Sequence, residues 1–175
     1  LQPDGELERD MCRISGACRF VYNKALSLQK ENYEAGHSFI SYVSMAKQLT
    51  QWRHSQETPW LKEAPCHPLQ HALKDLDRAY KNFFAKHADF PCFKRKGTHI
   101  SFRFPDPVQI KLDQTNSRIF LPKLGWIRYR KSREVLGELR NVTVTRSGKK
   151  WFISIQTERT VTPDPIATTA IGIDV

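Results

Sequence analysis

The sequence lacks the segments that would direct a protein to a membrane or out of the cell. No run of apolar residues is long enough to cross a bilayer, and no charged segment followed by an apolar one stands at the N-terminus. We therefore expect a cytoplasmic protein without a membrane partner. Internal repeats and low-complexity tracts are absent as well. With 39% apolar and 11% aromatic residues in 175, the chain suits one or two small domains with a buried core.

Cysteine is scarce, and its spacing does not fit a metal site. The four cysteines form no C-x-x-C pair and no close knuckle with histidine, so we expect no zinc site and four reduced, mostly buried thiols. His67 and His71 are four residues apart, but no third ligand stands at motif spacing beside them. We expect both histidines at the surface or at a helix cap. The cysteines are Cys12, Cys18, Cys66 and Cys92.

Acidic residues are scarce in one segment of the chain, residues 91–150. The formal net charge is +10, which favours a polyanionic partner. Residues 1–90 are nearly neutral, with 12 Lys and Arg against 11 Asp and Glu. Residues 91–150 contain 15 Lys and Arg against 4 Asp and Glu, and so hold the excess charge. Since these cations fall on expected strands and loops rather than on an amphipathic helix, they favour nucleic acid over a membrane surface.

The first half of the chain, residues 4–88, has the period of helices. An apolar stripe from Met11 to Gln29 predicts a first helix that starts near Asp4 and ends near Gly36. The further elements expected are a helix capped by Ser41 that continues to Trp52, a short turn from Thr58 to Leu61, and a helix with Pro68 in its first turn that ends near Phe84. Together these elements predict a helical module.

The side of the first helix away from this stripe has two interpretations. Phe20 lies opposite the apolar stripe and is flanked by Arg13 and Lys24, while Arg19 and Asn23 occupy a third side. This side is either a second packing face, which we favour because a long helix in a small bundle often buries two sides, or a basic and aromatic surface for a nucleic-acid backbone.

From Phe90 onward, short runs alternate between apolar and polar residues. Proline and glycine separate the runs, and Ser147-Gly148 is a plausible hairpin turn. Such a series of antiparallel strands over residues 90–160 predicts a small OB-like barrel, followed by a linker at residues 161–169. The expected strands cover residues 100–104, 108–112, 118–121, 125–130, 139–145 and 151–157.

The junction between the two halves combines cations with aromatic rings. The run FPCFKRKG occupies residues 90–97 and FRF occupies residues 102–104. Lysine and arginine follow phosphates while rings stack on exposed bases, so this composition predicts contact with a single strand or an A-form duplex. The candidate nucleic-acid contacts over the whole chain are Arg13, Arg19, Asn23, Lys24, Lys94, Arg95, Lys96, Arg103, Arg128 and Arg130.

The last residues, 171–175, form an apolar run with one carboxylate, Asp174. Many strands end in this way. Nuclease domains that use acidic residues and metal ions also begin with such a strand, because a buried strand holds an aspartate rigidly where two cations must bridge a phosphate.

A series of short motifs runs in order along nearly the whole chain. The motifs are GACRFVYNKAL at residues 16–26, WL at 60–61, LQHALKDLDRAYKNFF at 69–84, P-x-FK-x-K at 91–96, SFR at 101–103, LPKLG at 121–125 and IGID at 171–174. In this order they resemble the TnpB (OrfB) proteins of insertion sequences, which are similar to compact type V CRISPR effectors, that is, to RNA-guided DNA endonucleases.

The resemblance implies an α+β architecture with named parts. Residues 4–88 would be the recognition helices, residues 90–160 the wedge barrel, and residues 170–175 the start of a RuvC-like (RNase H-like) nuclease domain. Asp174 would be the first carboxylate of a site for Mg²⁺. Guide RNA and target DNA would be the partners, with the sequence read mainly by base pairing and the protein reading backbone shape and a motif beside the target.

The chain also departs from the family's pattern. The family's first strand is missing before Leu1, as are the other nuclease acids and the C-terminal zinc-binding cysteines, and one carboxylate cannot hold two metal ions. We therefore expect this fragment to bind nucleic acid without cutting it. The alternatives are a stand-alone OB-like binding module and a nuclease-dead repressor. A strand-transfer transposase is disfavoured, because no tyrosine nucleophile with a two-histidine motif is present.

Overall fold

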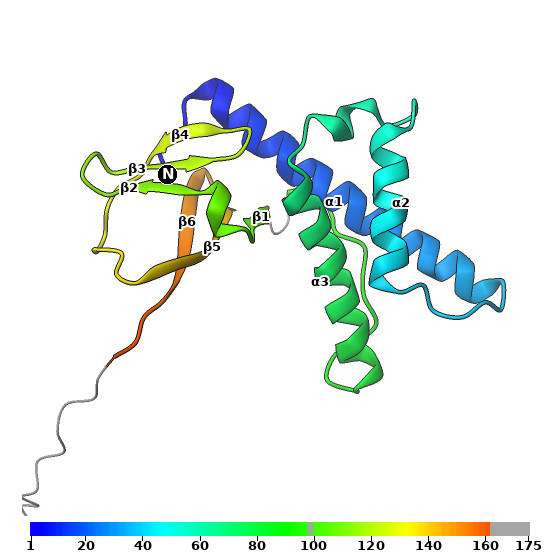
Figure 1. Ribbon diagram of the computed structural model, residues 1–175. Coiled ribbons are helices and arrows are strands. Elements are labelled where there is room, and N and C mark those ends of the chain that lie inside the picture. The colour runs from blue at the N-terminus through cyan, green and yellow to red at the C-terminus, as the bar shows by residue number, and fades with distance from the viewer. Residues whose placement is uncertain (98–99, 162–175) are drawn as a thin grey trace, which may run out of the picture.

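The computed structural model describes residues 1–97 and 100–161 and has an α+β fold (Figure 1). The helices come first and the strands follow, as the change of period near residue 90 predicts. The helical elements are α1 (Gly5–Glu34), α2 (Tyr42–His54), a 3₁₀ turn η1 (Pro59–Lys62) and α3 (Cys66–Phe84). The strands are β1 (Ser101–Phe104), β2 (Lys111–Asp113), β3 (Arg118–Leu121), β4 (Gly125–Arg128), β5 (Glu138–Ser147) and β6 (Lys150–Glu158).

The long helix α1 belongs to both halves of the molecule. Its first turn is capped by the Asp4 carboxylate, which accepts a hydrogen bond from the Leu7 backbone at 2.8 Å. Its 30 residues span about 45 Å. Figure 1 shows the N-terminal part of α1 beside the strands and its C-terminal part among the other helices. The Leu1 ammonium group donates to the Trp151 carbonyl at 2.7 Å, so the start of the chain is fixed to β6.

α3 packs on the apolar stripe of α1, and α2 packs on α3 and η1. Ser41 caps α2, as predicted, by accepting from the Ser44 backbone at 3.3 Å. The connection between α1 and α2 is held by Gln29, whose side chain donates to the Ile40 carbonyl at 2.6 Å and accepts from the Ile40 amide at 3.1 Å. α3 begins at Cys66, two residues before Pro68, and buries its leucine face against α1.

The six strands form two antiparallel sheets, each of three strands. The first has the order β1-β5-β6 and the second the order β2-β3-β4. The expected single closed barrel is therefore not formed among the described residues. Closure requires staggered strands that pair all the way round, whereas β2, β3 and β4 have only three or four residues each and pair only with one another.

The strand expected at residues 108–112 is wrong in its first half. Pro107–Gln109 is a 3₁₀ turn, η2, and β2 starts only at Lys111. The Asp106 carboxylate accepts from the Val108 backbone at 3.1 Å, and this turn competes with an extended strand. The hairpin at Ser147-Gly148 is confirmed, since Ser147 pairs with Lys150 and Gly148 has a positive φ of 59°.

One continuous hydrophobic core joins the two halves. Inward residues of both sheets, such as Phe102, Ile119 and Val142, belong to the same buried cluster as Leu26 and Leu73 of the helices. In the described part of the chain, no helix is both long enough and apolar enough to span a membrane.

The expectation for the thiols is only partly met. All four cysteines are free. Cys18 is buried, and burial raises the pKa of its thiol to about 12. Cys12 and Cys66 are half-buried and Cys92 is exposed, so the expectation of mostly buried thiols is wrong. Cys92 lies in the irregular segment between α3 and β1.

Candidate nucleic-acid interface

The ten predicted contact residues are spread over three parts of the fold. Arg13, Arg19, Asn23 and Lys24 lie on α1, and Lys94, Arg95 and Lys96 lie in the segment between α3 and β1. Arg103 is on β1, Arg128 ends β4, and Arg130 follows it. Their surroundings separate the residues that face solvent from those that hold the fold together.

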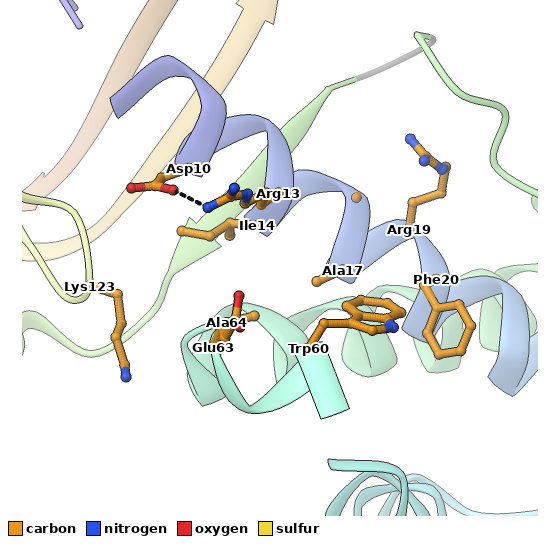
Figure 2. Close-up of a pocket in the computed structure, with 11 residues that line it drawn as sticks. Asp10, Arg13, Ile14, Ala17, Arg19, Phe20, Trp60, Glu63, Ala64 and Lys123 are labelled. Atoms are coloured by element: carbon orange, nitrogen blue, oxygen red, sulfur yellow. Dashed lines mark hydrogen bonds and ion pairs between the residues drawn. The ribbon is translucent and has the colours of Figure 1, made fainter. Parts of the chain in front are cut away.

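A groove of about 570 Å³ lies between the two halves of the molecule, where α1, η1 and the β3–β4 turn meet (Figure 2). We call it the junction groove. Its cations are Arg13 and Arg19 of α1 and Lys123 of the turn. Trp60 forms part of the wall and is 40% exposed, with its ring 5.0 Å from that of Phe20 in an edge-to-face arrangement.

The positive charge of this groove is partly balanced. Asp10 and Glu63 also line it, and the Arg13 guanidinium is 3.1 Å from the Asp10 carboxylate. Figure 2 shows Lys123 on the sheet side of the groove and Trp60 and Phe20 side by side at the other end. The groove can therefore offer phosphate-binding groups beside an exposed ring, but with a small charge excess.

Asn23, predicted as a nucleic-acid contact, holds the basic segment in place through its side-chain amide. Its amide donates to the Lys94 carbonyl at 3.0 Å and accepts from the Lys94 backbone N–H at 2.8 Å. We call this pair of bonds the Asn23 clamp. Because Arg19 lies one turn before Asn23 on the same side of α1, the clamp places the segment next to the basic side of the helix.

Cation–π contacts join the same segment to α1. The Lys94 ammonium lies 4.2 Å from the centre of the Tyr22 ring. Lys30 lies 4.9 Å from Phe93 and 5.4 Å from Phe90, and such cation–π contacts orient a lysine without neutralising it. Arg95 and Lys96 are exposed, and among the described residues no carboxylate lies within salt-bridge distance of either.

One predicted contact, Lys24, is built into the packing of the helices. Lys24 lies 5.6 Å from the Phe20 ring and 5.3 Å from the Trp52 ring, between α1 and α2. Phe20 itself packs on Trp60. The favoured interpretation of this side of α1 as a second packing face thus holds around Phe20 and Lys24, while Arg13 and Arg19 line the open groove.

Arg103 joins β1 to α3 and β5. Its guanidinium donates to the Thr143 hydroxyl at 3.0 Å and lies 3.5 Å from the His71 ring. His71 is buried, so the expectation of a surface or capping histidine is wrong for it. Its other ring nitrogen is 3.4 Å from the Asp75 carboxylate. Burial alone would raise the pKa of Asp75, but the hydrogen bond from His71 and the nearby charges outweigh burial and lower it.

The sheet β2-β3-β4 presents a second basic and aromatic surface. Arg118 is directly opposite Arg128 and Phe120 is directly opposite Trp126. The Arg118 guanidinium lies 4.6 Å from the Trp126 ring, and Trp126 is 45% exposed. We call this surface the sheet face; it consists of Lys111, Arg118, Phe120, Trp126 and Arg128.

Sequence reasoning found only Arg128 of the sheet face. The signal was available, because RIFL and GWIR alternate between inward and outward positions. Every outward side chain of these two runs is a cation or a ring. Two arginines directly opposite each other repel. Arg118 is partly compensated by the Asp113 carboxylate at 2.8 Å. Hydrogen bonds from Asn116 and then from Arg118 lower the pKa of that carboxyl to about 2, so it stays charged.

Asp174 falls outside the described residues, and the structure says nothing of its surroundings. In residues 1–97 and 100–161, no group of three or more His, Cys, Asp or Glu side chains is placed to hold a metal ion. The described residues therefore do not fit a Mg²⁺ site, and the carboxylate that the resemblance assigns to the metal stays a prediction.

These features define the class of the protein. It is an α+β protein whose helical half and sheet half both expose cations next to aromatic rings. A family model described as a helix-turn-helix domain, that of OrfB from IS605, matches residues 1–38. The matched residues contain α1 and the turn after it, whereas α2 starts at Tyr42.

Three curated relatives are similar to the chain. One, from Escherichia coli (strain K12), is named "Putative RNA-guided DNA endonuclease InsQ" and is 56% identical over 175 residues, covering 99% of this chain and 43% of the relative. Another, from Streptomyces pristinaespiralis, has the same name without "InsQ" and is 34% identical over 98% of this chain and 43% of its own length. The virulence protein VsdF of Salmonella dublin is 36% identical over 46% of this chain and 76% of its own length.

The chain belongs to the TnpB (OrfB) family. It spans less than half the length of the two relatives named as RNA-guided endonucleases.

Proposed function

We propose that this chain is the nucleic-acid-binding part of an RNA-guided DNA endonuclease. In that role it binds the guide RNA and the RNA–DNA heteroduplex and helps to read a short motif beside the DNA target. The β strands would act as the wedge domain and the three helices as the recognition module. Sequence discrimination would come mainly from base pairing, and the protein would read backbone shape and the flanking motif.

The observation that carries this proposal is the sheet face. The Arg118–Arg128 pair and the Phe120–Trp126 pair lie next to each other on the exposed side of two antiparallel strands. Paired arginines weaken an isolated sheet, and a phosphate between them removes the repulsion. The adjacent rings give unpaired bases a surface on which to stack.

Two further surfaces support the same role. The junction groove offers Arg13, Arg19 and Lys123, and the segment held by the Asn23 clamp offers Arg95 and Lys96. A protein that neutralises several phosphates binds with an affinity that falls steeply as salt rises. None of these surfaces is a recognition helix entering a major groove. The turn of residues 35–41 between α1 and α2 is longer than the roughly three or four residues typical of DNA-binding helix-turn-helix motifs.

Cleavage belongs to the longer protein in this proposal. Asp174 would be the first carboxylate of its nuclease site, where bound Mg²⁺ supplies charge for the attacking and leaving oxygens of the phosphodiester. The described residues of this chain bind and position the nucleic acid, and we expect the chain alone not to cut it.

The decisive experiment identifies the RNA that the protein carries. The protein is purified from its native host, the bound material is digested separately with RNase and DNase, and the surviving RNA is sequenced. One discrete RNA that ends in a short variable segment is the expected result. A random mixture, or no RNA, would instead favour the stand-alone binding module.

Charge reversal then tests the surfaces. The triple variant Arg95→Glu, Lys96→Glu and Arg128→Glu should bind a 20-nucleotide RNA strand more weakly at low salt. Its salt dependence should also be shallower, by roughly 0.7 in slope for each phosphate of a single strand that the variant no longer neutralises. The matched control reverses Lys47, Lys62 and Lys86, which are exposed in the helical half and outside all three surfaces. Equal weakening in both variants would mean that net charge alone attracts the RNA, which contradicts the assigned surfaces.

A further inference from the structure

The far end of the helical half contains an aromatic cleft that the proposed function does not use. It lies between the last turns of α1 and α3, has a volume of about 510 Å³, and is lined mainly by rings. Its aromatic residues are Tyr33, Phe39, Tyr80, Phe83, Phe84 and Phe90. Eleven residues of α1 separate Arg19 of the junction groove from Lys30 of this cleft, which is about 16 Å along the helix.

The rings of the cleft pack on one another, and several of them remain partly exposed. Tyr80 is the centre, with ring distances of 5.2 Å to Phe39, 5.6 Å to Phe90 and 6.1 Å to Phe84. Tyr80 is buried, whereas Phe84 is 63% exposed and Phe39 46% exposed. A cluster of large rings exposed to this extent is costly in water unless something covers it.

Cations flank the cleft on both sides. On one side, Lys30 lies between Phe90 and Phe93, and the chain continues directly into Lys94, Arg95 and Lys96. On the other side, Phe39 also lines a neighbouring hollow with three cations of α3, which are Lys74, Arg78 and Lys81. Carboxylates are fewer there: Glu34 stands on the cleft, and Asp77 in the hollow is paired with Lys81 at 2.8 Å.

We propose that the aromatic cleft binds an unpaired base of the nucleic acid, with the flanking lysines and arginines on the phosphates to either side. An apolar slot between two groups of cations matches a flat base within a polyanionic strand. A purely apolar protein segment would cover the rings but leave these charges without partners. This inference rests on the proposed function and adds a separate site to it, for a base that does not take part in pairing.

The test compares strands with and without bases. The probes are a 20-nucleotide uridine strand and an abasic strand of the same length, bound to the complete chain. Phe84→Ala and Phe39→Ala should each weaken binding of the uridine strand by about 5- to 100-fold and leave the abasic strand unchanged. Phe84→Leu should behave like Phe84→Ala, because it keeps apolar area but removes the ring. Val108→Ala is the control, because Val108 is 85% exposed and lies in the sheet half. This variant should bind both the uridine strand and the abasic strand as the wild type does.

Photocrosslinking locates the base directly. A strand carrying 5-iodouridine should crosslink to Phe84, Phe39 or Tyr33, as read by mass spectrometry, and the crosslink to position 84 should be absent in a Phe84→Ala variant. Both substituted rings are exposed, so the variants are expected to remain folded, and unchanged thermal unfolding of each variant checks this.

Each other outcome has a distinct meaning. If the wild type bound neither strand, the proposed function itself would be wrong. Normal binding of the uridine strand by both ring variants, with crosslinks elsewhere, would remove the cleft from the site and leave the proposed function standing. Concentration-dependent dimerisation of the wild type that Phe84→Ala abolishes would show that the rings meet a second copy of the chain, and would overturn the inference.

Discussion

The side-chain amide of Asn23 and the backbone of Lys94 pair in both directions, through hydrogen bonds of 3.0 and 2.8 Å. The Asn23 amide thus makes the two backbone hydrogen bonds that a neighbouring strand would make, and it holds an irregular segment against α1. The segment continues into Arg95 and Lys96, whose side chains remain exposed. Asn23, which the sequence suggested as a nucleic-acid contact, therefore also fixes the position of two exposed cations.

We predict that Asn23→Ala releases this segment. Removing two exposed hydrogen bonds should lower the free energy of unfolding by about 1 kcal/mol. Trypsin should then cut at Arg95 and Lys96 several-fold faster than in the wild type. Asn32→Ala is the matched control, because Asn32 also lies on α1 and donates to a loop carbonyl, that of Ser38, at 2.6 Å. Equal cutting rates in the Asn23 variant and the wild type would mean that other contacts hold the segment.

Arg128→Ser should separate stability from binding. Removing one of two opposed arginines should raise the free energy of unfolding by a few tenths of a kcal/mol at low salt, and by less at high salt. The same change should weaken RNA binding. Urea unfolding at two salt concentrations and fluorescence anisotropy measure the two effects. Lys149→Ser, in the β5–β6 hairpin turn, is the control and should change neither the free energy of unfolding nor RNA binding. A decrease in the stability of the Arg128→Ser variant would contradict repulsion across the strands.

The contact of Asp75 with His71 predicts a pH dependence. The folded-state pKa of Asp75 is lowered from its ordinary value of 3.8. Its contribution to stability is therefore fully present above that value and is lost as pH falls through the lower, folded-state pKa. Since the carboxylate is partly exposed, the contribution is on the order of 0.5 kcal/mol. Asp75→Asn should make the free energy of unfolding, measured with urea, depend less on pH in this acidic range than it does in the wild type.

The control for this effect is Asp77→Asn on the same helix. Asp77 pairs with exposed Lys81, away from Arg103 and His71. If both variants flattened the acidic range equally, the effect would come from general helix charge rather than from the contact of Asp75 with His71.

Asp174→Ala tests the metal assignment in the longer protein. If Asp174 is the first carboxylate of a two-metal site, the substitution should abolish DNA cleavage and leave guide RNA and target binding unchanged. Cleavage assays with Mg²⁺ and gel-shift assays without it measure the two activities. Retained cleavage would refute the role given to Asp174, and abolished binding would point to a structural role.

Local sequence patterns were sufficient for most of the helices and strands, although they missed the 3₁₀ turn Pro107–Gln109, but not for their assembly. Apolar periodicity and capping residues such as Asp4 and Ser41 predicted all three helices, because a helix depends on neighbours within a few residues. The alternation in RIFL and GWIR predicted β3 and β4. Barrel closure was not predictable in this way, since it depends on pairing between strands far apart, and the structure has two sheets instead.

The candidate site divides in the same manner. The sequence determined that residues 91–150 are strongly basic and that rings stand among the cations, which indicated a polyanionic ligand. Only the tertiary structure decided which of these cations are exposed and which are held in contacts within the protein. Asn23 meets Lys94 across 71 residues, and Arg103 meets His71 across 32. Composition and period carry no information on such contacts, because the geometry that joins distant residues arises only when the core is packed.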